Sequence, residues 1–165
     1  YQSANVHELL YSTVKTIFGD KVGKDKPVEL VWEKDTSLPE LLCYPGDLNQ
    51  VWTNIIDNAI QAMDGHGTLT IRTRRENEDM IRVEIGDTGP GIPEDNIERI
   101  FTPFFTTKPF GEGTGLGLDL AWQIVVKKHL GNLSVQSKPG DTTFIVCLPL
   151  QAPAPDAPMT AGEGD

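Results

Sequence analysis

DLNQVWTNIIDNAIQAM, residues 47–63, has the pattern of one long amphipathic helix. Its apolar residues recur at three- and four-residue spacing and form a single stripe, which consists of Leu48, Val51, Ile55, Ala59 and Ala62. Asp47 precedes the stripe and is expected to cap the helix. Asn54 and Asn58 lie one turn apart beside the stripe, so both amides should project from the same edge of this helix.

Shorter elements are predicted on both sides of this helix. Further helices are expected over residues 6–18 and 115–129, the second with an apolar stripe that includes Leu116, Leu120, Ile124 and Val125. Strands are expected over residues 28–32, 41–44, 69–73, 81–85, 133–137 and 143–148. The third and fourth of these strands indicate an antiparallel hairpin with a long, charged tip.

The grouping of these elements favours one fold class. Helices are not inserted strictly between strands, so a doubly wound sheet is disfavoured. The sequence predicts an α+β protein, namely a two-layer α/β sandwich. Its sheet should be mixed and mostly antiparallel, with about three helices on one face.

Composition and charge limit the classes of protein to consider. The chain has 165 residues and a formal net charge of −10, so one domain over residues 1–150 is expected and nucleic acid is a disfavoured partner. Residues 93–114 are rich in loop formers and are expected to include a lid, whereas the Pro-, Ala- and acid-rich residues 151–165 should be disordered.

Location can also be predicted. No stretch is long and apolar enough to span a membrane, so no membrane contact is expected. Cys43 and Cys147 show neither a disulfide nor a zinc pattern, which favours a cytoplasmic location. The missing initiator Met indicates a piece of a longer protein.

A glycine run, GTGLGL over residues 113–118, is the first candidate for phosphate binding. Glycines directly before a helix leave backbone N–H groups open to an anion. The run lacks the lysine and the spacing of a P-loop, and it follows a polar, interrupted segment rather than the buried strand of a dinucleotide fold. A hinge that binds no ligand remains the alternative for this run.

Amide and carboxylate side chains supply two further candidates. The side-chain oxygens of Asn54 and Asn58 are suitable ligands for magnesium, although solvated surface residues would show the same pattern. Asp87 follows a predicted strand and can accept a hydrogen bond from an exocyclic amine. Gly89 and Gly91 behind it would let a flat base approach the backbone, although an ordinary turn would also begin with Asp.

Four segments over residues 45–149 together resemble the ATP-binding catalytic domain of bacterial sensor histidine kinases. This is the superfamily with the Bergerat ATP-binding fold, shared with gyrase, the heat-shock chaperone ATPase and mismatch-repair ATPases. NIIDNA (residues 54–59) resembles the N box, DTGPGIP (87–93) the first glycine box, FTPFF (101–105) the F box and GTGLGL (113–118) the second glycine box. Each motif is weak alone, whereas four in order are specific.

The resemblance implies a role for individual residues in binding ATP or ADP with Mg²⁺. Asn58 would coordinate the metal, Asn54 would assist at the phosphates and Asp87 would accept the adenine amino group. Lys108 would neutralise phosphate, and Thr142 would support adenine recognition, although Asp141 stands where glycine is common. The implied nucleotide-binding set is Asn54, Asn58, Ala62, Asp87, Gly89, Gly91, Ile92, Phe104, Lys108, Gly113, Thr114, Gly115, Leu116, Gly117, Leu118 and Thr142.

The family also implies which reaction to expect. ATPase relatives carry Glu where this chain has Asn54, and an amide cannot act as a general base, so strong hydrolysis is not expected. His7, His66 and His129 all lack the surroundings of a phosphoacceptor.

The resemblance implies a kinase domain that acts on a histidine of separate dimerisation helices and serves a response regulator. The full-length protein would be a homodimer and this chain a monomer. Alternatives are a degenerate nucleotide-sensing module and an ATPase switch.

Overall fold

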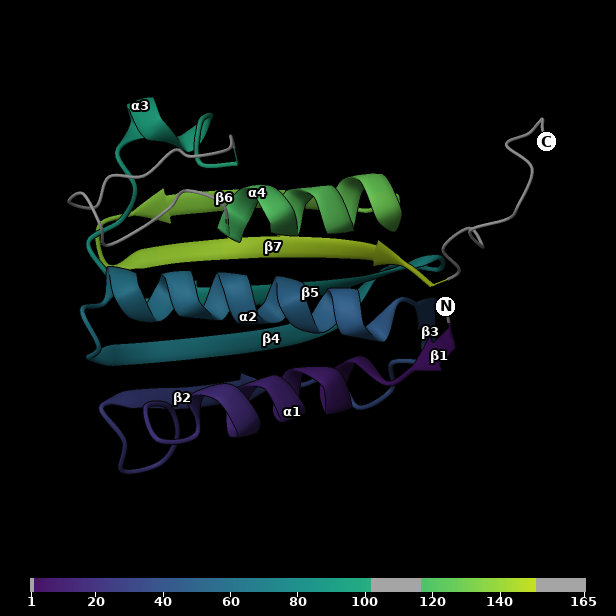
Figure 1. The fold of residues 1–165 in the computed structure, drawn as a ribbon, viewed down its shortest axis with the longest axis horizontal. Helices are drawn as coiled ribbons and strands as arrows, with labels where there is room; N and C mark the ends of the chain where they lie inside the picture. Colours follow the sequence, from purple (N-terminus) through teal and green to yellow (C-terminus); the bar gives the residue numbers. More distant parts are fainter. Residues whose placement is uncertain (1, 102–116, 151–165) are drawn as a thin grey trace.

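A mixed five-stranded sheet forms one layer of the protein, in the strand order β2-β4-β5-β7-β6 (Figure 1). The computed structural model describes residues 2–101 and 117–150. The strands are β2 (Val28–Glu33), β4 (Gly67–Asn77), β5 (Met80–Asp87), β6 (Asn132–Lys138) and β7 (Asp141–Pro149). β2 and β4 are parallel, and every other neighbouring pair is antiparallel. The predicted mixed, mostly antiparallel sheet is therefore confirmed.

Helices cover one face of this sheet (Figure 1). They are α1 (Val6–Phe18), α2 (Pro45–Ala62) and α4 (Gly117–Trp122), which continues as the π-helix η1 (Gln123–Lys128). A short helix, α3 (Glu94–Ile97), lies within the predicted lid. The two-layer α+β prediction is confirmed. No helix among residues 2–101 and 117–150 is both long and apolar enough to cross a membrane.

α2 begins two residues earlier than Asp47. Tyr44 is the N-cap residue, and Pro45 occupies the first turn, where its fixed backbone angle suits a helix start. The prediction that Asp47 caps the helix is therefore wrong; it lies inside the first turn, next to the positive end of the helix. Residues buried along α2 are Leu48, Val51, Trp52, Ile55, Ile56, Ala59 and Ile60. Ala62, which the sequence placed in the stripe, is exposed.

The hairpin of β4 and β5 has a short tip. Strand pairing continues to Asn77 and resumes at Met80, so the predicted long, charged loop is wrong. The error arises because residues 74–77 are all exposed, so this end of β4 lacks the apolar alternation of a strand although it pairs with β5. Leu120 is a second correction: it is 44% exposed and does not join the apolar stripe of its helix.

A small second sheet joins the beginning and the end of the described chain. β1 (Gln2–Ala4) pairs with β3 (Leu41–Cys43), and Leu42 donates its backbone N–H to the carbonyl of Leu150. The sequence predicted β3 but not β1. Asn5 then caps α1 by accepting hydrogen bonds from two backbone N–H groups.

Candidate functional site

Asp87 lies at the last position of β5 and is 3% exposed. Its Oδ1 accepts a hydrogen bond from the backbone N–H of Gly89 over 2.9 Å. Its Oδ2 is buried and has no hydrogen-bond partner among the residues described. Burial raises the pKa of this carboxyl, the charge of Asp141 raises it further, and the bond from Gly89 opposes both. A buried acceptor without a partner is suited to an N–H donor of a ligand.

Two glycines after Asp87 allow the loop to approach its neighbours closely. A Cβ at Gly89 would lie 2.9 Å from the backbone oxygen of Ala62 and 2.9 Å from Asp87 Oδ1. Gly91 has φ +95, and a Cβ there would lie 3.0 Å from the carbonyl of Lys138. The loop is therefore packed between the end of α2 and the β6–β7 turn, and side chains at these positions would displace it.

One edge of α2 connects this loop to the start of α4. The side-chain amide of Asn54 donates to the carbonyl of Gly117 over 2.9 Å. Asn58 and Ala62 follow at successive turns of the same helix, and Ala62 lies beside Gly89. Ala62 is eight positions after Asn54 on the helix, a distance of about 12 Å. The structure thus brings together the predicted residues of the helix edge, the Asp87 loop and Gly117.

Thr142 completes the site on the sheet. It is the cross-strand partner of Asp87 and is 3% exposed. Its hydroxyl lies 2.7 Å from Ser137 Oγ, which accepts a hydrogen bond from the backbone N–H of Ile92 over 2.7 Å. Ser137 was not among the residues predicted from the sequence. The feature that could have identified it is its position two residues after Val135, which places a polar side chain on the core-facing side of β6.

The remaining predicted site residues fall into two groups. Leu118 and Ile92 pack against the hydrophobic core with partly buried side chains. Phe101 of the F box also packs there, edge-on against Phe144 at a ring-centroid distance of 6.2 Å. The residues that lie outside the described ranges are Phe104, Lys108, Gly113, Thr114, Gly115 and Leu116.

The three histidines have ordinary structural surroundings. His129 is 1% exposed, its Nδ1 lies 2.9 Å from the carbonyl of Ile124, and its Nε2 accepts from the backbone N–H of Tyr44. Burial lowers the pKa of His129. His7 Nε2 contacts the hydroxyl of Thr73, and His66 Nδ1 lies 3.2 Å from the carbonyl of Asp64. Because both nitrogens of the buried His129 are engaged, a phosphoryl group could reach neither in this arrangement.

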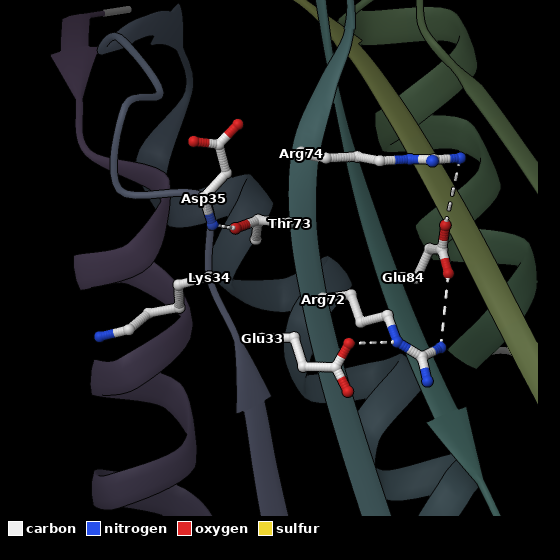
Figure 2. A pocket seen from close by; sticks show the side chains of 7 residues that line it. All are labelled: Glu33, Lys34, Asp35, Arg72, Thr73, Arg74 and Glu84. Atoms are coloured by element: carbon white, nitrogen blue, oxygen red, sulfur yellow. Dashed lines mark hydrogen bonds and ion pairs between the residues drawn. The ribbon is translucent and has the colours of Figure 1, made fainter.

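A charged groove of about 640 Å³ lies apart from the Asp87 loop, along β2 and β4 (Figure 2). Figure 2 shows Arg72 between Glu33 and Glu84, with Arg74 reaching Glu84 from the same strand. Glu84 also accepts a 2.7 Å hydrogen bond from Arg82. These arginine and glutamate side chains pair with one another, whereas Asp87 Oδ2 has no partner in the described part of the chain, so Asp87 is the better candidate for ligand binding.

Sequence comparison defines the class of protein to which this fold and site belong. Residues 43–152 match the family described as histidine kinase-, DNA gyrase B-, and HSP90-like ATPase. The chain belongs to this family, and the resemblance stated from its four motifs is confirmed.

Relatives place the chain more closely within the family. Sensor histidine kinase ZraS of Escherichia coli strain K12 is 35% identical over 150 residues, which is 90% of this chain and 31% of that protein. The chain therefore spans about a third of the length of this curated relative.

Solved structures agree with the same branch. The catalytic domain of histidine kinase ThkA matches with a TM-score of 0.79 and 27% identity, covering 91% of this chain and 97% of that one. ThkA has also been solved in complex with response regulator protein TrrA, with a TM-score of 0.76 and 26% identity over 90% of this chain and 41% of that one. Full-length ShkA in complex with AMPPNP matches with a TM-score of 0.77 and 25% identity, covering 92% and 31%. The predicted histidine-kinase-type catalytic domain is confirmed in family and fold.

Proposed function

We propose that this chain binds ATP and presents its γ-phosphate to a histidine on dimerisation helices outside these 165 residues. The observation that carries the proposal is the buried Oδ2 of Asp87, which has no partner among the described residues and whose loop packs against Ala62 at the end of α2. An ionised carboxylate at this position suits the exocyclic amino group of adenine, because a charge-assisted hydrogen bond would satisfy both partners.

Each part of the site would hold a different part of the nucleotide. Asp87 would bind the adenine amino group, with Gly89 and Gly91 giving the base access to the loop backbone. Asn58 lies midway along the α2 edge and would face the phosphates. Asn54 would help to fix the phosphate end of the site, since its amide holds the first residue of α4. The predicted phosphate contacts of Lys108 and of Gly113 to Leu116 belong to the same proposal.

Magnesium is part of this proposal, with Asn58 as its protein ligand. No group of three or more His, Cys, Asp or Glu side chains in the described part of the chain could hold a metal by itself. An amide oxygen on the α2 edge fits a site in which the nucleotide phosphates and water supply the other ligands. When bound, the ion would neutralise phosphate charge, which the net charge of −10 makes necessary.

Binding can be tested by titrating a fluorescent ATP analogue in the presence and absence of Mg²⁺. Asp87→Asn should weaken binding about tenfold or more, because a charge-assisted hydrogen bond is lost. Asn58→Ala should weaken binding chiefly when Mg²⁺ is present. Asp57→Asn is the matched control, since Asp57 bonds Gln61 on the same helix and should leave affinity unchanged. Unchanged affinity in both site variants would rule out the proposed site.

Phosphoryl transfer needs a separate test, with dimerisation helices added to the catalytic chain and radiolabelled ATP as donor. A kinase should label those helices with phosphate that is labile in acid and stable in base. Binding without labelling would favour a nucleotide-sensing module, and rapid release of phosphate by the chain alone would favour an ATPase switch.

The same proposal extends to the setting of the whole protein. It would be a homodimer, with this domain in the cytoplasm, where ATP is available, and a response regulator as the downstream partner. The complex of ThkA with TrrA supports the last of these by similarity.

A further inference from the structure

We propose that Ser137 is a positioning residue that favours adenine over guanine by orienting the hydroxyl of Thr142. The inference rests on the proposed nucleotide site and adds the group that controls its base selectivity. Ser137 is the last residue of β6 whose side chain lies on the core-facing side of the sheet. It pairs with Thr142 of β7 and accepts a hydrogen bond from the loop residue Ile92.

Geometry allows either hydroxyl to be the donor in the Ser137–Thr142 contact, and we assign the donor role to Ser137. A serine hydroxyl has one proton to donate and two lone pairs to accept. The backbone N–H of Ile92 occupies one lone pair of Ser137 Oγ over 2.7 Å. Among the described residues, the acceptor within reach of the Ser137 proton is Thr142 Oγ1, also at 2.7 Å. A hydroxyl that accepts a hydrogen bond becomes a stronger donor, so the bond from the Ile92 N–H favours donation from Ser137 to Thr142.

This direction leaves the proton of Thr142 free to point elsewhere. Thr142 is buried and stands opposite Asp87 across the strand pair, with both side chains on the helix-facing side of the sheet. A donor from Thr142 therefore stands next to an acceptor from Asp87 Oδ2, which has no partner among the described residues. The two groups form a fixed acceptor–donor pair at the end of β5.

Adenine matches this pair and guanine does not. The adenine edge carries an amino donor beside the N1 acceptor, whereas guanine carries the O6 acceptor beside an N1–H donor. Asp87 would accept from the adenine amino group, and Thr142 would donate to N1 directly or through one water. Without Ser137, the Thr142 hydroxyl can rotate and accept from a guanine N1–H, so discrimination should fall.

Ser137 also holds the backbone of Ile92, which is a purely structural contribution. The two contributions have different signatures. Loss of the loop anchor would weaken all purine nucleotides equally, because every base uses the same loop. Loss of hydroxyl orientation would weaken ATP selectively and reduce the ratio of ATP affinity to GTP affinity.

The test measures dissociation constants for ATP, GTP and inosine triphosphate in the wild-type chain and four variants. Ser137→Ala should lower the affinity ratio of ATP to GTP, and of ATP to inosine triphosphate, by about tenfold. Ser137→Thr keeps the hydroxyl and should restore both ratios. Ser134→Ala is the matched control, because Ser134 lies on the same strand with its side chain on the opposite face. The fourth variant, Thr142→Val, should lower the ratios by itself.

Coupling between the two hydroxyls provides the stricter check. In a Thr142→Val background, Ser137→Ala should change neither ratio further, since the group it orients is absent. An equal fall for all three nucleotides in Ser137→Ala would reduce Ser137 to a loop anchor and overturn the proposal. Unchanged ratios in Ser137→Ala would overturn it as well. A folded wild-type chain that binds none of the nucleotides would instead overturn the proposed function, on which this inference depends.

Discussion

Asn54 holds Gly117 through a 2.9 Å hydrogen bond from its side-chain amide to the backbone carbonyl, which ties α2 to the first residue of α4. Gln50, one turn earlier on α2, donates to Asn54 Oδ1 over 2.7 Å and so holds the amide in the orientation that reaches Gly117. These two hydrogen bonds thus stabilise the position of α4 against α2 in the ligand-free protein.

Asn54→Ala should lower the free energy of unfolding by about 1 kcal/mol, because one hydrogen bond between two helices is lost. Chemical denaturation measures this change. Gln50→Ala is the control, since it removes only the bond to Asn54 Oδ1 and should cost less than half as much. Equal losses in the two variants would mean that the Gly117 contact contributes nothing to stability.

Gly89→Ala should damage the Asp87 loop. The added methyl would lie 2.9 Å from the oxygen of Ala62 and from Asp87 Oδ1, so the loop or the end of α2 must shift. Overpacking of this kind costs about 1–3 kcal/mol, and binding of a fluorescent ATP analogue should weaken together with stability.

A glycine on α2 itself should respond in the opposite way to Gly89 of the loop. Gly46 lies in the first turn, and a methyl group there would meet no atom within 4 Å. Gly46→Ala should therefore stabilise the protein by up to about 1 kcal/mol and leave nucleotide affinity unchanged. Denaturation and titration of both variants side by side would separate the effect of the loop from a general effect of removing glycine.

Predictability from sequence differed between helices and strands. The helix over residues 6–18 was predicted with its exact bounds, because its apolar periodicity ends at Gly19. β1 was missed, since three residues without apolar alternation form a strand only by pairing with the distant residues 41–43. The predicted hairpin tip was too long because the exposed, polar residues 74–77 indicated a loop, whereas they extend β4 by pairing with β5.

The candidate site shows the same limit. The motifs specified which residues to consider, and their order along the chain predicted that Asp87 ends a strand. Sequence could not give the cross-strand pairing of Asp87 with Thr142, because that depends on β7 lying beside β5. Ser137 was missed for the same reason. Its contact with Ile92 joins residues that are far apart in the sequence, and its contact with Thr142 depends on the register between β6 and β7.

His129 should make stability depend on pH. Burial lowers its pKa, with the nearby Lys128 adding to the effect and Asp47 opposing it. In the unfolded chain this histidine takes up a proton near pH ~6.5, whereas the folded protein resists protonation until a lower pH. Its contribution to stability is therefore fully present above the unfolded pKa and is lost as the pH falls from that value through the folded pKa.

Denaturation at pH values of about 7.5 and about 5.5, which lie on either side of the unfolded pKa, measures this loss of stability. His129→Gln keeps an acceptor for the Tyr44 N–H and a donor for the Ile124 carbonyl but does not titrate. The wild-type protein should lose more stability between the two conditions than this variant does. His7, whose pKa burial also lowers, is present in both proteins and cancels in the comparison. Equal losses would show that His129 does not control the pH dependence.

Glu84→Gln should destabilise the folded protein, because Glu84 pairs with arginines on the sheet face that the helices do not cover. The Glu84 side chain is 15% exposed and contacts Arg72 and Arg74 (Figure 2). It also contacts Arg82, so its neutralisation leaves three guanidinium groups with a weaker acceptor. A loss of about 1–2 kcal/mol is expected from denaturation. Glu33→Gln is the control, because Glu33 is 54% exposed and contacts Arg72, and exposed pairs contribute about 0–1 kcal/mol. Nucleotide affinity should be unchanged in both variants.

Asp87→Asn should stabilise the ligand-free protein while weakening nucleotide binding. The folded pKa of Asp87 is raised, so any stability that this group contributes is present below the unfolded pKa and is lost as the pH rises through the folded pKa. The raised pKa means that this carboxyl costs the folded protein free energy at neutral pH, and its replacement by an amide should raise the free energy of unfolding by roughly 1 kcal/mol. The expected gain should disappear when the two proteins are compared below the unfolded pKa of ~3.9, where the wild-type carboxyl is also neutral. Destabilisation by Asp87→Asn at neutral pH, without ligand, would show that the carboxylate is retained for the fold rather than for a ligand.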